Sequence, residues 1–317
     1  MDSIAKYIKE IKDEKLKVYD FINKARYQSG LLSDLSIWNQ ICSSQYVLGD
    51  TLQAIQGYLD SDYPTSIGLR YLNIYGILQA LFIQQDAIKN LGEALTYTIK
   101  ENSDFKEIRE IRNASIGHPT KLGTKNKMSY NYIVQVSMRK ENFLLEQFTH
   151  SDQEDRFHNI NLVDLIEKQL RGILFSFREI THMLSLKDQC HKDRFKEVVM
   201  EDYFSKLSYQ LEKVGEGIYN PSISNTDFTI SMLKSIETAY IDFESDLNRR
   251  DELQSRKELQ YDLDMYKHAL QRIRSYLSND ANNELKETDA RIYLYYIQKQ
   301  NEYFRELARE FDVEYNV

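Results

Sequence analysis

The sequence predicts a mostly α-helical protein, built as a helical bundle with a small β-hairpin insertion and followed by a C-terminal helical bundle. Only 3 Pro and 11 Gly interrupt 317 residues, so few positions force a helix to end. Hydrophobic residues make up 42% of the chain and charged residues 28%, which is typical of folded globular proteins and excludes the disordered and fibrous classes. This length is sufficient for two domains, each with its own core.

Apolar residues recur at helical spacing along most of the chain, and this pattern defines the expected elements. In a first domain, residues 1–187, we expect helices over 3–26, 35–59, 71–95 and 162–186, and a further helix that begins after Asn102, Ser103 and Asp104, which are all favourable N-cap residues. The first helix is expected to end near Ser29 and Gly30. In a second domain, residues 188–317, we expect helices over 195–215, 226–249, 253–277 and 284–311. The helix over 71–95 is apolar on nearly every side, which predicts burial at the centre of its bundle.

One segment of the first domain has the composition of β-strands. Residues 129–138 read SYNYIVQVSM and residues 142–149 read NFLLEQFT, and both are rich in β-branched and aromatic residues. Arg139, Lys140 and Glu141 between them suit a hairpin turn. We therefore expect a two-stranded insertion near 129–149.

The N-terminal segment, MDSIAKYIKEIKDEKLK, alternates charged and apolar residues and has no continuous hydrophobic run. This pattern excludes a signal peptide or a transmembrane span, so we expect a cytoplasmic protein without a membrane partner. The two cysteines, Cys42 and Cys190, are far apart and form no CxxC pair, so the sequence predicts neither a disulfide framework nor a zinc site. No motif for a cofactor is found, and we expect none.

The formal net charge of −8 opposes a broadly basic nucleic-acid coat. One stretch, residues 104–127, reverses this sign with six basic residues and three acidic ones. The basic residues are Lys106, Arg109, Arg112, Lys121, Lys125 and Lys127. A solvated helix surface accounts for such a run equally well, so the charge alone assigns no function.

Within this basic stretch lies the segment Arg112-Asn-Ala-Ser-Ile-Gly-His118-Pro119. On a regular helix, residues six positions apart lie about 120° apart around the axis, so Arg112 and His118 would not converge. Gly117, however, can adopt the left-handed conformation that ends helices, and Pro119 disfavours the α conformation for His118. We therefore expect the chain to turn back at Gly117 and to carry His118 toward the face that bears Arg112.

An arginine and a histidine in one place suit chemistry on a phosphodiester. A guanidinium binds non-bridging phosphate oxygens and stabilises the added negative charge of a pentacoordinate transition state. An imidazole, with an unperturbed pKa of about 6.5, exchanges a proton at neutral pH. No metal is required where the 2′-hydroxyl of RNA is the nucleophile, and this requirement restricts the substrate to RNA.

The same residues resemble the R-x(4 to 6)-H motif of the HEPN superfamily, α-helical domains of bacterial toxins, phage-defence proteins and CRISPR-associated ribonucleases. Asn113 fits the polar residue that often follows the arginine in that family. The resemblance covers roughly residues 35–186 and implies a metal-independent endoribonuclease that leaves a 2′,3′-cyclic phosphate. It further implies a homodimer with a composite active site and, in toxin or defence systems, an antitoxin or defence protein as partner.

This resemblance assigns roles to five residues. Arg112 is expected to hold the phosphate, His118 to act as acid-base catalyst, and Asn113 to orient one of them or the phosphate. Arg109 and Lys121 are candidates for substrate binding.

Two alternatives remain open. The first is a non-catalytic scaffold of HEPN type that binds a protein or nucleotide, which the acidic charge and 23 tyrosines favour. The second is an unrelated all-α protein in which Arg112 forms a surface ion pair with Glu107, Glu110 or an acid distant in sequence, and His118 interacts with a helix C-terminus.

Overall fold

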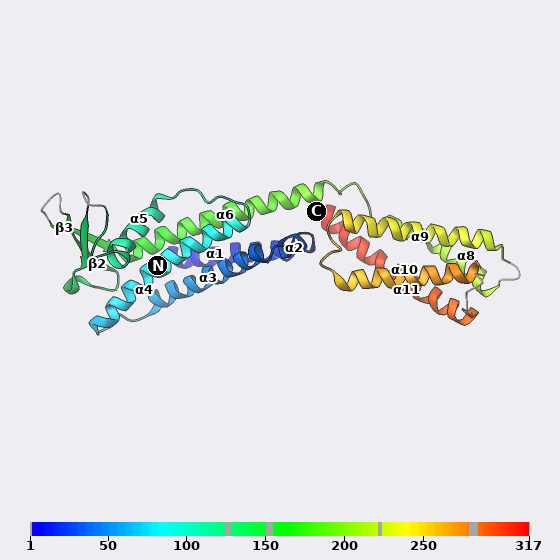
Figure 1. Ribbon diagram of the computed structural model, residues 1–317, viewed down its shortest axis with the longest axis horizontal. Coiled ribbons are helices and arrows are strands. Elements are labelled where there is room, and N and C mark those ends of the chain that lie inside the picture. The colour runs from blue at the N-terminus through cyan, green and yellow to red at the C-terminus, as the bar shows by residue number, and fades with distance from the viewer. Residues whose placement is uncertain (1, 124–127, 150–154, 221–223, 279–284, 317) are drawn as a thin grey trace. The chain divides into compact units, whose positions relative to one another are not determined.

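The computed structural model of the protein describes residues 2–123, 128–149, 155–220, 224–278 and 285–316 (Figure 1). Over these residues the chain forms eleven α-helices and one three-stranded antiparallel sheet, so it is mostly helical as predicted. It divides into two compact units, one of Met1–Ile22 with Leu31–Ser185 and the other of Asn23–Gly30 with Leu186–Val317. The expected boundary at residue 187 lies close to the division at 185, whereas the assignment of Asn23–Gly30 to the second unit has no counterpart in the sequence pattern.

The first unit is a bundle of long helices. It contains α1 (Asp2–Ile22), α3 (Leu35–Asp60), α4 (Ile67–Ala94), α5 (Ser103–Arg112) and most of α6 (Leu162–Asp193), and α3 packs along α4. Its core consists of apolar side chains contributed by these helices, among them Ile11, Ile41, Leu48, Leu81, Ile88, Ile108 and Ile173, each fully buried. The expected helices over 35–59, 71–95 and 162–186 are confirmed, with ends that differ by up to seven residues.

The first expected helix is too long in the prediction. It ends at Ile22, and a separate helix, α2 (Ala25–Leu32), runs through Ser29 and Gly30, where the sequence predicts an end. The new helix begins where the backbone amides of Tyr27 and Gln28 donate to the Lys24 carbonyl. The break separates the first unit from the segment whose Arg26 is buried in the second unit, a long-range contact that helical periodicity does not reveal.

The prediction of a fully buried helix over 71–95 is also wrong. One face of α4 is exposed and apolar, with Leu69 51%, Leu72 63%, Tyr75 40% and Ile83 38% accessible. These residues recur at helical spacing along one side, while Leu78, Leu81 and Ile88 on the opposite side are fully buried. The bundle therefore covers only one face of this helix.

The insertion has three strands rather than two. β1 (Ser129–Ile133) pairs antiparallel with β2 (Asn142–Thr149), and β2 pairs antiparallel with β3 (Asp155–Asn161). The sequence of β3, DRFHNIN, lacks the apolar and β-branched composition on which the hairpin prediction depends. Its pairing with β2 determines its conformation, and this pairing is a tertiary contact.

Side-chain hydrogen bonds between the region at the end of α3 and the β1–β2 connection hold the sheet on the bundle. The ammonium group of Lys140, between β1 and β2, donates to the Leu59 carbonyl at 2.8 Å, in the last turn of α3. The hydroxyl of Tyr63 donates to the Met138 carbonyl at 2.6 Å, and that of Tyr58 donates to the Lys140 carbonyl. Figure 1 shows the sheet at one end of the bundle, close to α5.

The second unit is entirely helical over its described residues. It contains α7 (Asp202–Ser205), α8 (Ser208–Tyr219), α9 (Thr226–Arg249), α10 (Lys257–Leu277) and α11 (Glu287–Asn316) around a core rich in aromatic rings. The prediction for 226–249 is confirmed, and the helices over 253–277 and 284–311 are confirmed with shifted ends; residue 284 lies outside the described residues.

The expected helix over 195–215 is replaced by a short helix and a longer one. The carboxylate of Asp312 accepts from the backbone amides of Met200 and Glu201, both at 2.8 Å, directly before α7. This contact comes from α11, so the local pattern does not predict where the helix begins. None of the helices in the described part of the chain combines the length and the apolar character that a membrane crossing needs.

Candidate active site

Helix α5 carries the arginines of the motif, and its first turn is fixed by a side-chain cap. The Asn102 carboxamide oxygen accepts from the backbone amides of Asp104 at 2.8 Å and Phe105 at 3.3 Å, so Asn102 is the N-cap among the three expected candidates, and the helix already includes Ser103 and Asp104. Phe105 lies so close to α6 that a Cβ on Gly172 would be 2.5 Å from its ring. The missing side chain at Gly172 therefore permits the close approach of α5 to α6.

The motif ends in a π-helical turn rather than at a left-handed glycine. Asn113–Gly117 form the turn, and the backbone amide of His118 donates to the Asn113 carbonyl five residues earlier at 2.7 Å. Gly117 is not among the residues with positive φ, so the expected left-handed conformation is wrong. His118 itself leaves the helix, with φ −137° and ψ 49°, as expected for a residue before proline.

The guanidinium of Arg112 is held by neutral groups. Its Nε and Nη2 donate to the side-chain oxygen of Gln79 on α4, at 3.2 Å and 2.9 Å, and its Nη1 donates to the side-chain oxygen of Asn113 at 3.0 Å. The Phe82 ring lies beneath it, 4.4 Å from the guanidinium carbon. Among the described residues no carboxylate forms an ion pair with Arg112, so the expected alternative of a bridge to Glu107 or Glu110 is not formed. The positive charge is oriented without being neutralised.

Gly117 lies directly against this guanidinium. A Cβ at Gly117 would be 2.7 Å from Arg112 Nη1 and 3.1 Å from the Asn113 side-chain oxygen. In a π turn, residues five apart lie above one another, which is why Gly117 lies over Arg112. The turn therefore brings the arginine against the residue that precedes His118.

His118 is exposed, and its backbone is fixed on both sides. Its own amide is bound to Asn113, and the carbonyl of the next residue, Pro119, accepts from the Asn131 amide of β1 at 2.7 Å. Strand β1 thus holds the segment that carries the imidazole. No hydrogen bond joins the Arg112 and His118 side chains within the described part of the chain, and the imidazole faces solvent.

Asn113 contacts both residues of the motif. Its side-chain oxygen accepts from Arg112, and its backbone oxygen accepts from His118. The orienting role that the resemblance implies for Asn113 would act through these two contacts.

Arg109 lies one turn earlier and is engaged by the protein. It donates to the side chains of Gln85, at 2.7 Å, and Asp86. Its guanidinium carbon also lies 4.5 Å from the centroid of the Phe82 ring. Because Asp86 pairs with it, Arg109 offers less positive charge to a substrate than Arg112 does. The candidate substrate residue Lys121 is exposed, and no contact brings it to Arg112; Lys125 and Lys127 of the basic stretch lie outside the described residues.

Two residues of this site, Gln79 and Phe82, are missed by the sequence interpretation. They lie on α4, thirty or more residues before Arg112. The signal in the sequence is the presence of polar residues, Gln79, Gln84 and Gln85, within an otherwise apolar helix. Gln84 and Gln85 are buried and Gln79 is half-buried, and such positions require a polar partner.

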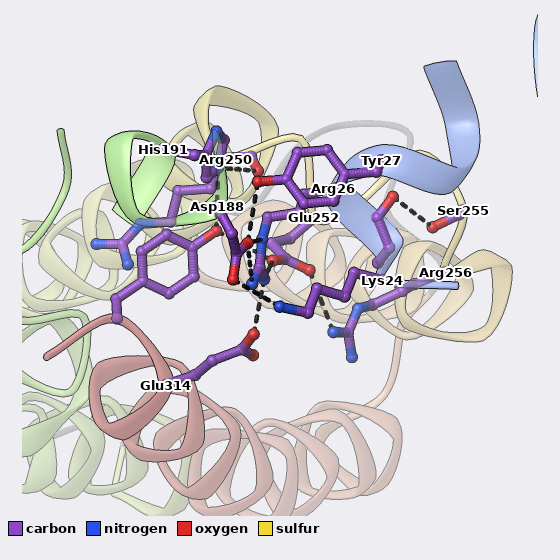
Figure 2. A network of polar contacts seen from close by, with 12 residues as sticks. Lys24, Arg26, Tyr27, Asp188, His191, Arg250, Glu252, Ser255, Arg256 and Glu314 are labelled. Atoms are coloured by element: carbon purple, nitrogen blue, oxygen red, sulfur yellow. Dashed lines mark hydrogen bonds and ion pairs between the residues drawn. The ribbon is translucent and has the colours of Figure 1, made fainter. Parts of the chain in front are cut away.

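A second polar cluster, in the second unit, is also missed (Figure 2). Arg26, whose side chain is 1% exposed, donates to Asp188 at 2.9 Å, to Glu252 at 2.8 Å and to Glu314 at 2.7 Å. Lys24 also pairs with Asp188. A cleft of about 380 Å³ adjoins these residues, but its cations and carboxylates neutralise one another, and the cluster fixes the segment 23–30 to the unit.

The comparisons with known proteins identify no relative. No protein-family model matches the chain, and no curated protein and no solved structure is significantly similar to it.

Proposed function

We propose that the protein is a metal-independent endoribonuclease of the HEPN type, with Arg112 as the phosphate-binding residue and His118 as the acid-base catalyst. The observation that carries the proposal is the arrangement around Asn113, which contacts the guanidinium through its side chain and the histidine through its backbone. The resemblance of the Arg-Asn-x4-His segment to the HEPN motif supports the same function. A bacterial toxin or phage-defence protein is the setting in which such an activity is used.

The charge state of Arg112 supports phosphate binding. Three hydrogen bonds to neutral oxygens orient the guanidinium, and its remaining N–H groups have no partner among the described residues. A phosphodiester supplies the negative charge that the protein does not. In the proposed step the 2′-hydroxyl oxygen attacks phosphorus, the 5′-oxygen leaves, and His118 transfers the proton, which yields a 2′,3′-cyclic phosphate and a 5′-hydroxyl.

The exposed apolar face of α4 supports a homodimer. Leu72, Tyr75 and Ile83 on this face flank Gln79, the residue that holds Arg112, so the apolar surface is continuous with the candidate site. An exposed apolar patch of this kind is typical of a protein interface. A second copy bound through this face would bring a second Arg112–His118 pair close to the first.

The activity is tested by incubating the purified protein with single-stranded RNA in EDTA. We expect cleavage to 2′,3′-cyclic phosphate ends, none of a DNA strand of the same sequence, and a loss of about a hundredfold or more in His118→Ala. His182→Ala, an exposed histidine on α6, is the matched control and should retain full activity. Equal cleavage by wild type and His118→Ala, or none by wild type at high concentration, would refute the proposal.

The dimer is tested separately by light scattering. Leu72→Glu places a charge on the exposed face of α4 and should convert a dimer to a monomer with an unchanged circular dichroism spectrum. Tyr46→Glu, at a residue of α3 that is 73% exposed, is the control and should stay dimeric. A wild-type monomer at all concentrations would exclude the composite site.

The scaffold alternative is favoured by one observation: among the described residues no acidic side chain orients the imidazole of His118. If the protein is a scaffold, the wild type and His118→Ala should bind the partner with equal affinity, and neither should cleave RNA.

A further inference from the structure

The three-stranded sheet has an open face that carries four aromatic side chains. Directly paired residues point to the same side of a sheet, so the register places Tyr130, Phe148 and Asp155 in one row. The adjacent row consists of Tyr132, Glu146 and Phe157. The opposite side carries buried residues such as Ile133, Phe143 and Leu145.

The aromatic rings of this face are accessible. Tyr132 is 54% exposed, Phe157 58%, Tyr130 38% and Phe148 37%. The rings of Tyr130 and Phe148 pair across strands with centroids 6.3 Å apart. Most large apolar residues in this unit are buried, so four exposed aromatics on so small a sheet indicate a contact surface.

The charged groups among these rings are carboxylates. Glu146 lies between Tyr132 and Phe157, and Asp155 lies beside Phe148. Arg156 and His158 alternate with them along β3 and therefore point to the other side. A face of rings and carboxylates attracts cations through ring quadrupoles and ion pairs, and it repels phosphate.

The edge beside this face is open as well. β3 is the last strand in the order β1-β2-β3, so its outer edge pairs with no other strand of the described chain. An extended segment that paired with β3 would place every second side chain on the aromatic face, at a spacing of about 7 Å.

From these observations we propose that the open face of the sheet, together with the outer edge of β3, binds an extended protein segment that carries lysine or arginine at alternate positions. This face consists of Tyr130, Tyr132, Glu146, Phe148, Asp155 and Phe157. A basic side chain from the added strand reaches Phe157 and Asp155 first, and Glu146 lies one strand further in. The net charge of −8 attracts such a partner over a longer range. The proposal does not depend on ribonuclease activity.

The test measures fluorescence anisotropy of labelled nine-residue peptides with the full-length protein. The probe peptide alternates threonine and lysine, a control peptide alternates threonine and glutamate, and a third probe is a ten-nucleotide oligouridine. We expect the lysine peptide to bind, with an affinity that falls as the salt concentration rises. The glutamate peptide and the oligouridine should not displace it from the sheet.

Three variants locate the site. Phe157→Ala and Glu146→Gln should each weaken binding of the lysine peptide by about threefold to tenfold, as expected for loss of one cation–π or charge contact. Tyr261→Ala, at a residue of α10 that is 64% exposed, is the matched control and should bind as wild type does. Circular dichroism verifies that each variant is folded.

Several results would overturn the proposal. If the lysine peptide fails to bind, or binds equally to wild type, Phe157→Ala and Glu146→Gln, the face is not a site for basic segments. If the oligouridine binds and Phe157→Ala abolishes that binding, the surface stacks nucleic-acid bases instead. RNA cleavage by His118→Ala is a separate measurement, so failure of one proposal leaves the other intact.

Discussion

At the scale of single residues, the contact of Gly117 with Arg112 connects backbone geometry to the candidate chemistry. The π turn lays the glycine against the guanidinium, with room for a hydrogen atom but not for a methyl group. The sequence predicts a left-handed helix end at Gly117, but Gly117 does not have a positive φ. The structure requires glycine because the backbone there lies against the Arg112 guanidinium.

Gly117→Ala is therefore expected to impair catalysis more than stability. The added methyl group would displace the flexible guanidinium from Gln79 and Asn113, since the backbone at Gly117 has no left-handed strain. We expect a loss of roughly tenfold to a hundredfold in RNA cleavage, with a change in unfolding free energy of about 1 kcal/mol or less. Cleavage rates and urea denaturation measure the two effects.

The control for this variant is Gly57→Ala on α3, where no atom lies within 4 Å of the added Cβ. It should gain about 1 kcal/mol from higher helix propensity and cleave as wild type does. If Gly117→Ala cleaves as well as Gly57→Ala, the contact with Arg112 has no role in catalysis.

At the scale of elements, the sheet serves as the support of the motif. The Asn131 backbone amide of β1 donates to the Pro119 carbonyl, next to His118. The sheet in turn is held on the bundle by Lys140, which donates to the Leu59 carbonyl at the end of α3. The carbonyls of the last turn of α3 lack helical partners, and a lysine ammonium satisfies them well.

Lys140→Ala is expected to loosen the sheet. Loss of the bond to the Leu59 carbonyl should cost about 1–2 kcal/mol and speed amide hydrogen exchange in β1 and β2. Arg139→Ala is the matched control, because the Arg139 side chain donates to the nearby Val136 and Met138 carbonyls and not to α3 in the described part of the chain. Exchange that is equally fast in both variants would contradict the anchoring role of Lys140.

At the scale of the whole molecule, the second unit incorporates a segment of chain that lies between α1 and α3 in sequence. Arg26 holds this segment through three carboxylates (Figure 2). The centroid of the Tyr315 ring also lies 5.4 Å from its guanidinium carbon. Buried ion pairs add little net stability when complete, but the loss of one partner leaves uncompensated charge.

Arg26→Met should therefore destabilise the second unit by about 3 kcal/mol, because Asp188 and Glu252 lose the buried cation that they share and keep only the more exposed partners Lys24 and Arg256. Guanidinium denaturation and limited proteolysis of this unit measure the loss. Arg305→Met removes an exposed partner of Glu201, which keeps Arg309, and should cost about 1 kcal/mol or less. Equal effects of the two variants would show that the cluster is not important for stability.

The same cluster predicts a loss of stability in acid. Burial opposes ionisation of Asp188, but hydrogen bonds from Lys24 and Arg26 outweigh it and lower its pKa to about 2. An unfolded aspartate titrates near pH 3.9, so the unfolded chain binds a proton first, and about 2 kcal/mol should be lost as the pH falls from about 4 to about 2.

His191 adds an earlier step to this acid sensitivity. Burial, and then the charge of Arg26, lower its pKa, so the folded protein resists a proton that the unfolded chain accepts below about pH 6.5. Stability should decline from that pH downward, and His191→Gln should remove this step while leaving the one below pH 4. Urea midpoints measured between pH 7 and pH 2.5 would test both, and a flat profile down to pH 4 in wild type would contradict the role of His191.

The sequence by itself determined the helical class, a capped helix start within residues 102–104, the helix over 226–249 and the residue types of the motif. These features depend on local hydrogen bonds and on periodicity within one element. Only the tertiary structure decided that Gln79 and Phe82 hold Arg112, that α4 leaves one apolar face open, that β3 is a strand and that Arg26 is buried. Each of these depends on which elements meet in space, and no periodicity within one element specifies that.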